Sequence, residues 1–228
     1  MEKVYVKKLA INDFIASEAI NSLRTNFLSL GVSSAAITSF GRSAGTTSVA
    51  FRLASALAAS GRKTLLIEAD MRTGSLAGDL GHTETVKGLS HYLTGSAELT
   101  EILCPTDDDK LHIIFAGDTV TNCSDLLSGD AYKKLIDSAK SEFDHIIVDT
   151  APVGQVTDCA VVARELDGAI LVINAKRNNY KLEARAKHDI ESVGVKLLGV
   201  VLNRADYKDK GGYYGKAHSG KYGYGKNK

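Results

Sequence analysis

Short, almost continuous runs of apolar residues recur along the chain and predict strands that are buried on both faces. This pattern differs from the strict alternation of strands that keep one face in water, and it is typical of a parallel sheet covered on both sides by helices. The runs occupy residues 35–40, 63–70, 111–117, 145–152, 168–176 and 197–203.

Between these runs, apolar residues recur at helical spacing. Helices are predicted over 48–61, 130–143 and 179–194, and the first and last of them end at a glycine. A further helix is predicted over 12–30, before the first strand. Alternating strands and helices predict an α/β fold of the P-loop NTPase-like type, with a mostly parallel sheet flanked by helices. Ligands of such sheets bind beyond the carboxyl ends of the strands.

The last 22 residues, 207–228, differ in composition from the rest of the chain. They contain five tyrosines, six glycines and six lysines, and no aliphatic side chain larger than alanine. Such a segment cannot bury a core, so we expect a disordered tail. The predicted organisation is therefore a single α/β nucleotide-binding domain over residues 1–206, followed by this tail.

Composition narrows the class of protein. The chain has 228 residues, 44% of them hydrophobic and 24% charged, which is ordinary for one soluble domain. A formal net charge of +1 argues against nucleic acid as a partner. No apolar run approaches a membrane span of roughly 18 residues, and the N-terminus does not resemble a signal peptide. The three cysteines are expected to be free thiols in a reducing cytosol, namely Cys104, Cys123 and Cys159.

A glycine-rich stretch, "SFGRSAGTTSVA", follows the first predicted strand, where a phosphate-binding loop would lie. Gly45 and Thr47 fit the pattern G-x-x-x-x-G-K-[ST], but the lysine position holds Thr46 and Gly41 comes one place late. Consecutive backbone N–H groups at a helix N-terminus could still surround phosphates. Taken alone, the stretch is equally compatible with an ordinary strand-to-helix turn.

Three carboxylates follow other predicted strands. Glu68 and Asp70 close the second run, and within a strand their side chains would point to one face, with Arg72 next to them. Asp149 closes the run at 145–152 in the manner of a Walker B aspartate. Any one of these acids could instead cap the following element. Together, beside one candidate phosphate loop, they favour a Mg²⁺ site, since this ion prefers oxygen ligands.

These motifs resemble a known family over nearly the whole chain. "IEADMR" after the loop and "IIVDTAP" later are similar to the bacterial protein-tyrosine kinases of capsule and exopolysaccharide systems, in their separate-chain, cytosolic form. That family belongs to the deviant-Walker ATPases, with the septum-site and partition ATPases. "SEAINSLRTNF", "GLSHYLTGSAELTEIL", "VVLNRAD" and the tyrosine-rich tail also match the family pattern.

The resemblance implies a role for each matching position. ATP or ADP would be bound with Mg²⁺, and catalysis would depend on Glu68, Asp70 and Arg72. The nucleotide-binding residues would be Gly41, Arg42, Ser43, Ala44, Gly45, Thr46, Thr47, Ser48 and Asn203, the last near the adenine. The metal would be held by Thr47, Glu68, Asp70 and Asp149. The phosphorylated tyrosines would be Tyr207, Tyr213, Tyr214, Tyr222 and Tyr224.

The resemblance also implies partners. A homo-oligomer, expected to be a ring, would use Glu18, Arg24 and Asn26 as subunit contacts. A membrane adaptor protein of the polysaccharide co-polymerase type would bring the cytoplasmic chain to the inner face of the plasma membrane. An active kinase paralogue could act beside it.

The sequence departs from the family pattern in three places. In the loop, Arg42 replaces proline and Thr46 replaces lysine. Glu68 stands where the second Walker motif usually has aspartate, and "VTNCSDLL" stands where the family has a Pro-rich stretch after the central strand. Losing one cation that neutralises transition-state charge can cost on the order of 10²–10³ in rate. Three functions therefore remain open: a weakened tyrosine autokinase, a pseudokinase subunit phosphorylated in trans, and, ranked last, a partition-type ATPase.

Overall fold

The computed structural model describes residues 4–6, 14–81, 86–154, 157–177 and 179–205, and the predicted tail lies outside them. The helices are α1 (Phe14–Ser29), α2 (Thr46–Ala59), α3 (Leu76–Asp79), α4 (Leu89–Leu93), α5 (Leu99–Ile102), α6 (Cys123–Ser128), α7 (Asp130–Glu142), α8 (Asp158–Arg164) and α9 (Tyr180–Ser192). The strands are β1 (Ser34–Thr38), β2 (Thr64–Glu68), β3 (Cys104–Pro105), β4 (Leu111–Ile114), β5 (His145–Asp149), β6 (Ala169–Asn174) and β7 (Leu197–Asn203).

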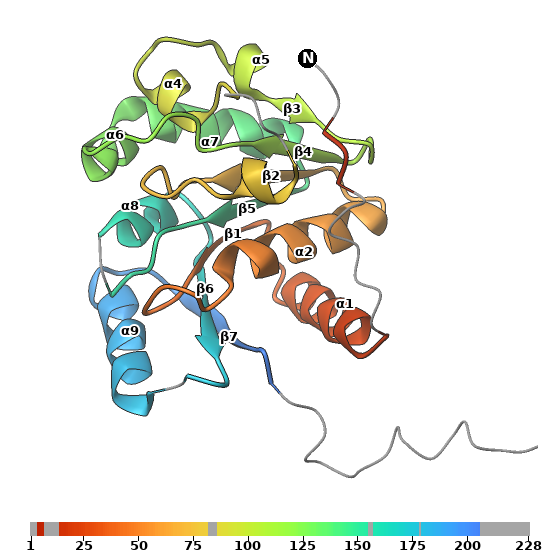
Figure 1. Cartoon of the computed structure of the whole chain (residues 1–228), viewed down its shortest axis with the longest axis vertical. Helices are drawn as coiled ribbons and strands as arrows, with labels where there is room; N and C mark the ends of the chain where they lie inside the picture. The colour runs from red at the N-terminus through yellow and green to blue at the C-terminus, as the bar shows by residue number, and fades with distance from the viewer. Residues whose placement is uncertain (1–3, 7–13, 82–85, 155–156, 178, 206–228) are drawn as a thin grey trace, which may run out of the picture.

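All strands lie in one sheet, in the order β3-β4-β2-β5-β1-β6-β7 (Figure 1). Every pairing is parallel except that of β3 with β4. The six predicted strands are confirmed, and so is the P-loop NTPase-like arrangement of a mostly parallel sheet flanked by helices. The two-residue strand β3 was not predicted, because it is too short to leave a pattern in the sequence.

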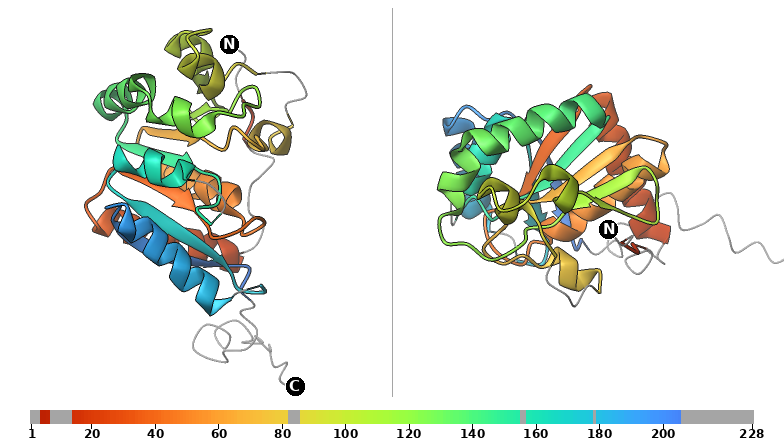
Figure 2. Two further views of the ribbon diagram at one scale, coloured as in Figure 1. Left: turned by 90° about the vertical axis from the view of Figure 1, so that its left-hand side faces the viewer. Right: turned by 90° about the horizontal axis from the view of Figure 1, so that it is seen from above.

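Helices cover both faces of the sheet (Figure 2). One apolar cluster packs the sheet against α7, α8 and α9, and a second packs its other face against α1 and α2. The central strands β1, β2 and β5 are buried at every residue. No helix in the described part of the chain has both the length and the apolar character needed to cross a bilayer.

The edge strand β7 corrects one expectation. Its apolar run predicted burial on both faces, yet Val200 and Leu202 are 55% and 56% exposed. They pair in register with Leu171 and Ile173 of β6, which face the cluster formed with α9. Although α9 contacts both β6 and β7, it leaves these two side chains of the edge strand exposed. An apolar run alone therefore does not distinguish an edge strand from a central one.

Strand order places the predicted site. Because β5 lies between β1 and β2, the carboxyl ends of these strands are adjacent. In register, Asp149 pairs with Ile37 of β1 on one side and with Glu68 of β2 on the other. The loop after β1 and the acids after β2 and β5 therefore meet at one edge, where open α/β sheets bind ligands.

Candidate phosphate and metal site

The loop between β1 and α2 has the backbone of a tight turn into a helix. Gly45, immediately before α2, is left-handed with φ 89°, and Ser43 is left-handed with φ 65°. The first turn of α2 contains no acidic residue of its own, and the N–H groups of its first residues, Thr46, Thr47 and Ser48, have no partner within the helix. A helix N-terminus in this state favours an anion.

Asp149 is the buried acid at the base of this loop. It is 2% exposed, and burial raises the pKa of its carboxyl to about 8, although the hydroxyls of Thr47 and Thr46 favour the charged form. One carboxylate oxygen, Oδ1, is buried and has no hydrogen-bond partner. A buried, unpaired carboxylate oxygen is costly unless a cation or a proton satisfies it.

Both carboxylate oxygens of Glu68 accept hydrogen bonds from backbone N–H groups, which could not be predicted from the sequence. Its Oε1 accepts a hydrogen bond from the N–H of Leu76 at 2.8 Å, and its Oε2 accepts one from the N–H of Ala116 at 3.1 Å. Burial raises the pKa of Glu68, and these backbone donors oppose the shift. The side chain thus joins the start of α3 to the segment that follows β4. Its predicted roles in metal binding and catalysis stay predictions, and these contacts do not support them.

Asp70 lies beyond the end of β2, which corrects the idea that Glu68 and Asp70 share a strand face. The strand stops because Asp70 forms its own turn. Its Oδ1 accepts from the N–H groups of Arg72 at 3.2 Å and Thr73 at 3.3 Å, and its Oδ2 accepts from the Thr73 hydroxyl at 2.6 Å. Aspartate commonly bonds its backbone two or three residues on in this way.

Arg72 is held by an acid that the sequence analysis missed. Its Nε lies 3.0 Å from Oδ2 of Asp158, and its Nη2 lies 3.4 Å from Oδ1. The Asp158 side chain is 1% exposed, and the Ser124 hydroxyl also donates to it. Arg72 further donates to the carbonyl of Thr121 at 3.3 Å. This network joins the loops that follow β2, β4 and β5. In the sequence, Asp158 resembles an ordinary cap at the start of α8.

The residues present fit a Mg²⁺ ion that is bound together with a nucleotide. The described residues contain no group of three or more His, Cys, Asp or Glu side chains that could hold a metal by themselves. Mg²⁺ is usually bound by one or two protein ligands together with phosphate oxygens and waters. The unpaired oxygen of Asp149 beside the Thr47 hydroxyl matches that requirement.

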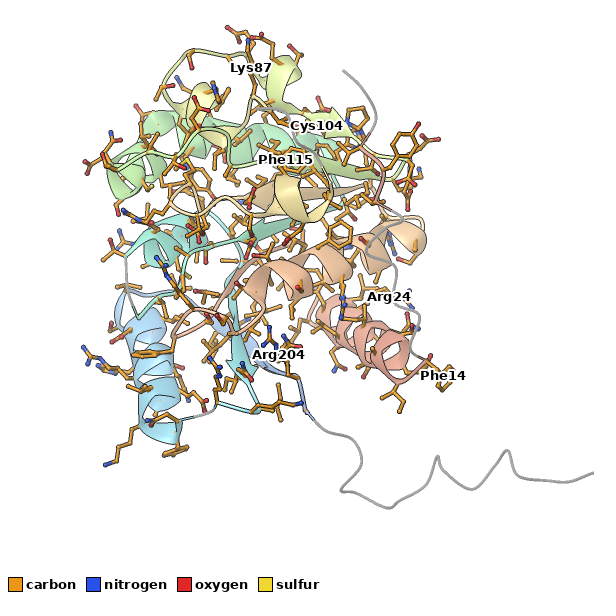
Figure 3. The ribbon with its side chains drawn as sticks, viewed as in Figure 1. Phe14, Arg24, Lys87, Cys104, Phe115 and Arg204 are labelled. Atoms are coloured by element: carbon orange, nitrogen blue, oxygen red, sulfur yellow. The ribbon has the colours of Figure 1, made fainter. Side chains whose placement is uncertain are left out.

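The other predicted nucleotide-binding residues lie on two sides of the loop. Asn203, at the end of β7, donates its amide to the carbonyl of Ala44 at 2.8 Å. With Ser48 it lines a groove of about 1100 Å³ between α1, α2 and β7. Arg42 and Gly41 line a separate cavity of about 160 Å³ that β6 and α9 complete. Arg204, the residue after β7, also borders the groove, below α2 in Figure 3.

The predicted subunit contacts all lie on α1, which packs against α2. Arg24 lies between these helices (Figure 3), and its Nη1 donates to the carbonyl of Ala56 at 3.4 Å. Glu18 is exposed and accepts from Asn21 at 3.3 Å, while Asn26 lines the groove. Part of the contact surface predicted for Arg24 is therefore used within the chain. The five tail tyrosines lie outside the described residues.

The sequence matches a family model and curated relatives. Residues 36–186 match the AAA domain family AAA_31. The chain is 38% identical over 203 residues to the tyrosine-protein kinase CpsD of Streptococcus agalactiae, which covers 86% of this chain and 89% of the relative.

Solved structures of tyrosine-kinase proteins have the same fold as this chain. The chimerical protein CapA2B2 superposes with a TM-score of 0.80 at 30% identity, covering 85% of this chain and 86% of that one. The kinase domain of the Escherichia coli tyrosine kinase ETK superposes with a TM-score of 0.77 at 32% identity, covering 87% and 80%. At 24% identity and a TM-score of 0.64, the septum site-determining protein MinD of Pyrococcus horikoshii, solved with Mg-ADP, shares the fold over 82% of this chain and 72% of its own. The chain therefore belongs to the bacterial protein-tyrosine kinase family, and Thr46 stands at the lysine position of the P-loop pattern.

Proposed function

We propose that this chain is a nucleotide-binding member of the tyrosine-kinase family that regulates capsular or exopolysaccharide synthesis and export. It transfers the γ-phosphate of ATP to tail tyrosines of a neighbouring subunit, at a rate weakened by Thr46. The observation that carries the proposal is the unpaired Oδ1 of buried Asp149 beneath the N-terminus of α2. An orphan carboxylate oxygen beside Thr47 suits a site that is completed when Mg–nucleotide binds.

Each group in the site has a task in this proposal. The N–H groups of the loop and of the first turn of α2 would hold the phosphates. Thr47 and Asp149 would hold Mg²⁺, whose contribution when bound would be to neutralise charge in phosphoryl transfer. Asp70, fixed in its turn, orients the tyrosine hydroxyl and accepts its proton. Arg72 keeps the three surrounding loops in place through Asp158. The base lies in the groove beside Asn203.

A pseudokinase subunit is the second candidate, and two observations favour it. Thr46 cannot supply a cation to the phosphates, and both Glu68 carboxylate oxygens already accept from backbone N–H groups. In that case the chain acts with a membrane adaptor and an active paralogue phosphorylates its tail. The partition-type ATPase ranks last, because the tyrosine-rich tail has no role in it.

Nucleotide binding followed by phosphotyrosine detection tests the proposal. Calorimetry with ADP and ATP, each with and without Mg²⁺, should show binding that Mg²⁺ strengthens. Incubation with Mg-ATP should then give a low level of phosphotyrosine, mapped by mass spectrometry to residues 207–228. Nucleotide binding with no phosphotyrosine unless an active family kinase is added would select the pseudokinase. No binding of either nucleotide in any condition would overturn the proposed kinase and leave the pseudokinase.

The proposed setting is the inner face of the plasma membrane. The domain over residues 1–206 remains in the cytoplasm and reaches the membrane through an adaptor of the polysaccharide co-polymerase type. The tail over 207–228, with six lysines and five tyrosines, changes charge when phosphorylated. Each phosphate adds about −1.5 to −2 charges, so several would reverse the sign of the tail and weaken its contacts with acidic surfaces.

Assembly gives a separate prediction. The chain is expected to form a ring or other homo-oligomer through α1, and Arg24→Ala is expected to shift it toward monomer in light scattering. Because Arg24 also donates to the carbonyl of Ala56, the variant could lose stability for that reason alone. The unfolding temperature of the variant is therefore measured together with its oligomeric state. Arg185→Ala is the control, because that arginine is 72% exposed on α9. An unmutated chain that stays monomeric at high concentration, with and without Mg–nucleotide, would contradict the prediction.

A further inference from the structure

Two asparagines at the ends of neighbouring strands hold consecutive carbonyls of the phosphate loop. The side-chain amide of Asn174 donates to the carbonyl of Ser43 at 3.2 Å, and that of Asn203 donates to the carbonyl of Ala44 at 2.8 Å. The two asparagines are register partners at the last positions of β6 and β7. Register partners on parallel strands present their side chains on the same face, so the two amides act side by side.

Each asparagine is itself fixed by its oxygen. Oδ1 of Asn174 accepts from the N–H of Lys176 at 3.0 Å, and Oδ1 of Asn203 accepts from the N–H of Arg204 at 2.9 Å. Because both loop partners are carbonyl oxygens, only the NH₂ group of each side chain can serve them. The hydrogen-bond network therefore determines which way each amide points.

The loop has a conformation that needs such support. Ser43 is left-handed, with φ 65°, which non-glycine residues adopt only at a cost. A Cβ at Gly45 would come within 2.3 Å of Nδ2 of Asn203, so the amide packs directly on the loop. The Ser39 hydroxyl holds a third loop carbonyl, that of Gly41, at 2.8 Å. Strained backbone of this kind persists where its surroundings fix it.

We propose that Asn174 is a positioning residue for nucleotide binding that acts together with Asn203. In a planar trans peptide the C=O and the following N–H point in opposite directions. Holding the carbonyls of Ser43 and Ala44 against β6 and β7 therefore aims the N–H groups of Ala44 and Gly45 away from these strands, for use by phosphate. The two amides order a loop that has Thr46 in place of lysine. This inference rests on the proposed nucleotide site.

Asn174→Ala in the full chain tests the inference against a matched variant. It should raise the Kd for Mg-ADP, measured by calorimetry, about three- to tenfold, as expected for one lost hydrogen bond. Asn174→Asp should raise it at least as much, since a carboxylate cannot donate to a carbonyl. The control is Asp108→Ala at the opposite edge of the sheet, which removes a carboxylate that accepts from the N–H of Lys110 at 2.9 Å. That variant should lower the unfolding temperature and leave the Kd unchanged.

A second measurement does not depend on nucleotide. Amide hydrogen exchange at Ala44 and Gly45 in the nucleotide-free protein should quicken in Asn174→Ala and stay unchanged in Asp108→Ala. If exchange quickens in Asn174→Ala but the unmutated chain binds no nucleotide, the support of the loop by the two asparagines is confirmed and only the proposed nucleotide-binding function is contradicted. Unchanged exchange at these residues would overturn the inference, as would an equal rise of Kd in both variants.

Discussion

Replacing Thr46 by lysine is expected to strengthen Mg-ADP binding roughly ten- to a hundredfold, because a charge-assisted contact with phosphate contributes about 1.5–3 kcal/mol. The rest of the loop is in place for this change. Thr46 is the first residue of α2, directly after the left-handed Gly45, and the first turn of α2 has no acidic residue of its own. Isothermal titration of both proteins measures the gain.

The same variant should raise tail phosphotyrosine by a larger factor. A cation that neutralises charge in the transition state affects rate by on the order of 10²–10³, more than it affects ground-state binding. The measurement is the initial rate of phosphotyrosine formation with Mg-ATP. Because tail tyrosines are expected to be modified by a neighbour, rates must be compared at equal protein concentration.

Thr46→Met separates charge from side-chain length. Methionine is nearly as long as lysine but carries no charge, so it should give neither gain. If Thr46→Lys folds with an unchanged unfolding temperature and improves neither binding nor rate, the loop does not present its N–H groups to phosphate. The pseudokinase would then be the better description.

The strands were predictable because they are buried on both faces. A parallel sheet between two layers of helices requires side chains such as Ile37 and Ile147 to be apolar at every position, and both are fully buried. The position of the phosphate loop followed from the first strand and the glycine after it. The end of a strand is harder to predict, because it depends on side chains such as Asp70 that form a turn with their own backbone.

Contacts between segments that are far apart in the chain could not be predicted from the sequence. Arg72 and Asp158 are 86 positions apart, and nothing near Asp158 distinguishes it from a helix cap. Asn174 lies 131 positions from Ser43, and its role depends on the order of β1, β6 and β7 in the sheet. The sequence marked Glu68 as a candidate site acid, but its backbone partners, the N–H groups of Leu76 and Ala116, became visible only in the structure.

The second large effect concerns Asp149→Asn, which is expected to stabilise the nucleotide-free protein at alkaline pH. Burial raises the pKa of this carboxyl from 3.8 to about 8, so the native state keeps a proton that the unfolded chain has already lost. Between about pH 4 and pH 8 the native state binds more protons, and the free energy of unfolding therefore falls as pH rises. Above pH 8 this loss is complete.

Asparagine resembles the protonated carboxyl and does not titrate, so the variant should lack this pH-dependent loss. Each pKa unit corresponds to about 1.4 kcal/mol, which puts the advantage of the variant at pH 9 on the order of several kcal/mol. Near pH 4 the advantage should disappear. Denaturant unfolding of both proteins across this range, without nucleotide or Mg²⁺, measures it.

Asp167→Asn is the matched control because the same change there should act in the opposite direction. Burial alone would raise the pKa of Asp167, but hydrogen bonds from Ser33 and Ser34 outweigh it and hold that pKa below its usual value. Its charged form stabilises the native state above the unfolded pKa, and that contribution is lost as pH falls through the folded pKa. The control variant should therefore be less stable than the unmutated chain at neutral pH.

Asp149→Asn should weaken Mg²⁺-dependent nucleotide binding although it raises the stability of the nucleotide-free protein. If Asp149 is held in the site as a ligand for Mg²⁺, the variant binds Mg-ADP more weakly, while its affinity for ADP without Mg²⁺ changes little. A gain in stability together with a loss of Mg²⁺-dependent affinity is the pattern of a residue kept for function at a cost in stability. Equal loss of affinity with and without Mg²⁺, together with lower stability at pH 9, would instead make Asp149 a structural acceptor at the end of β5.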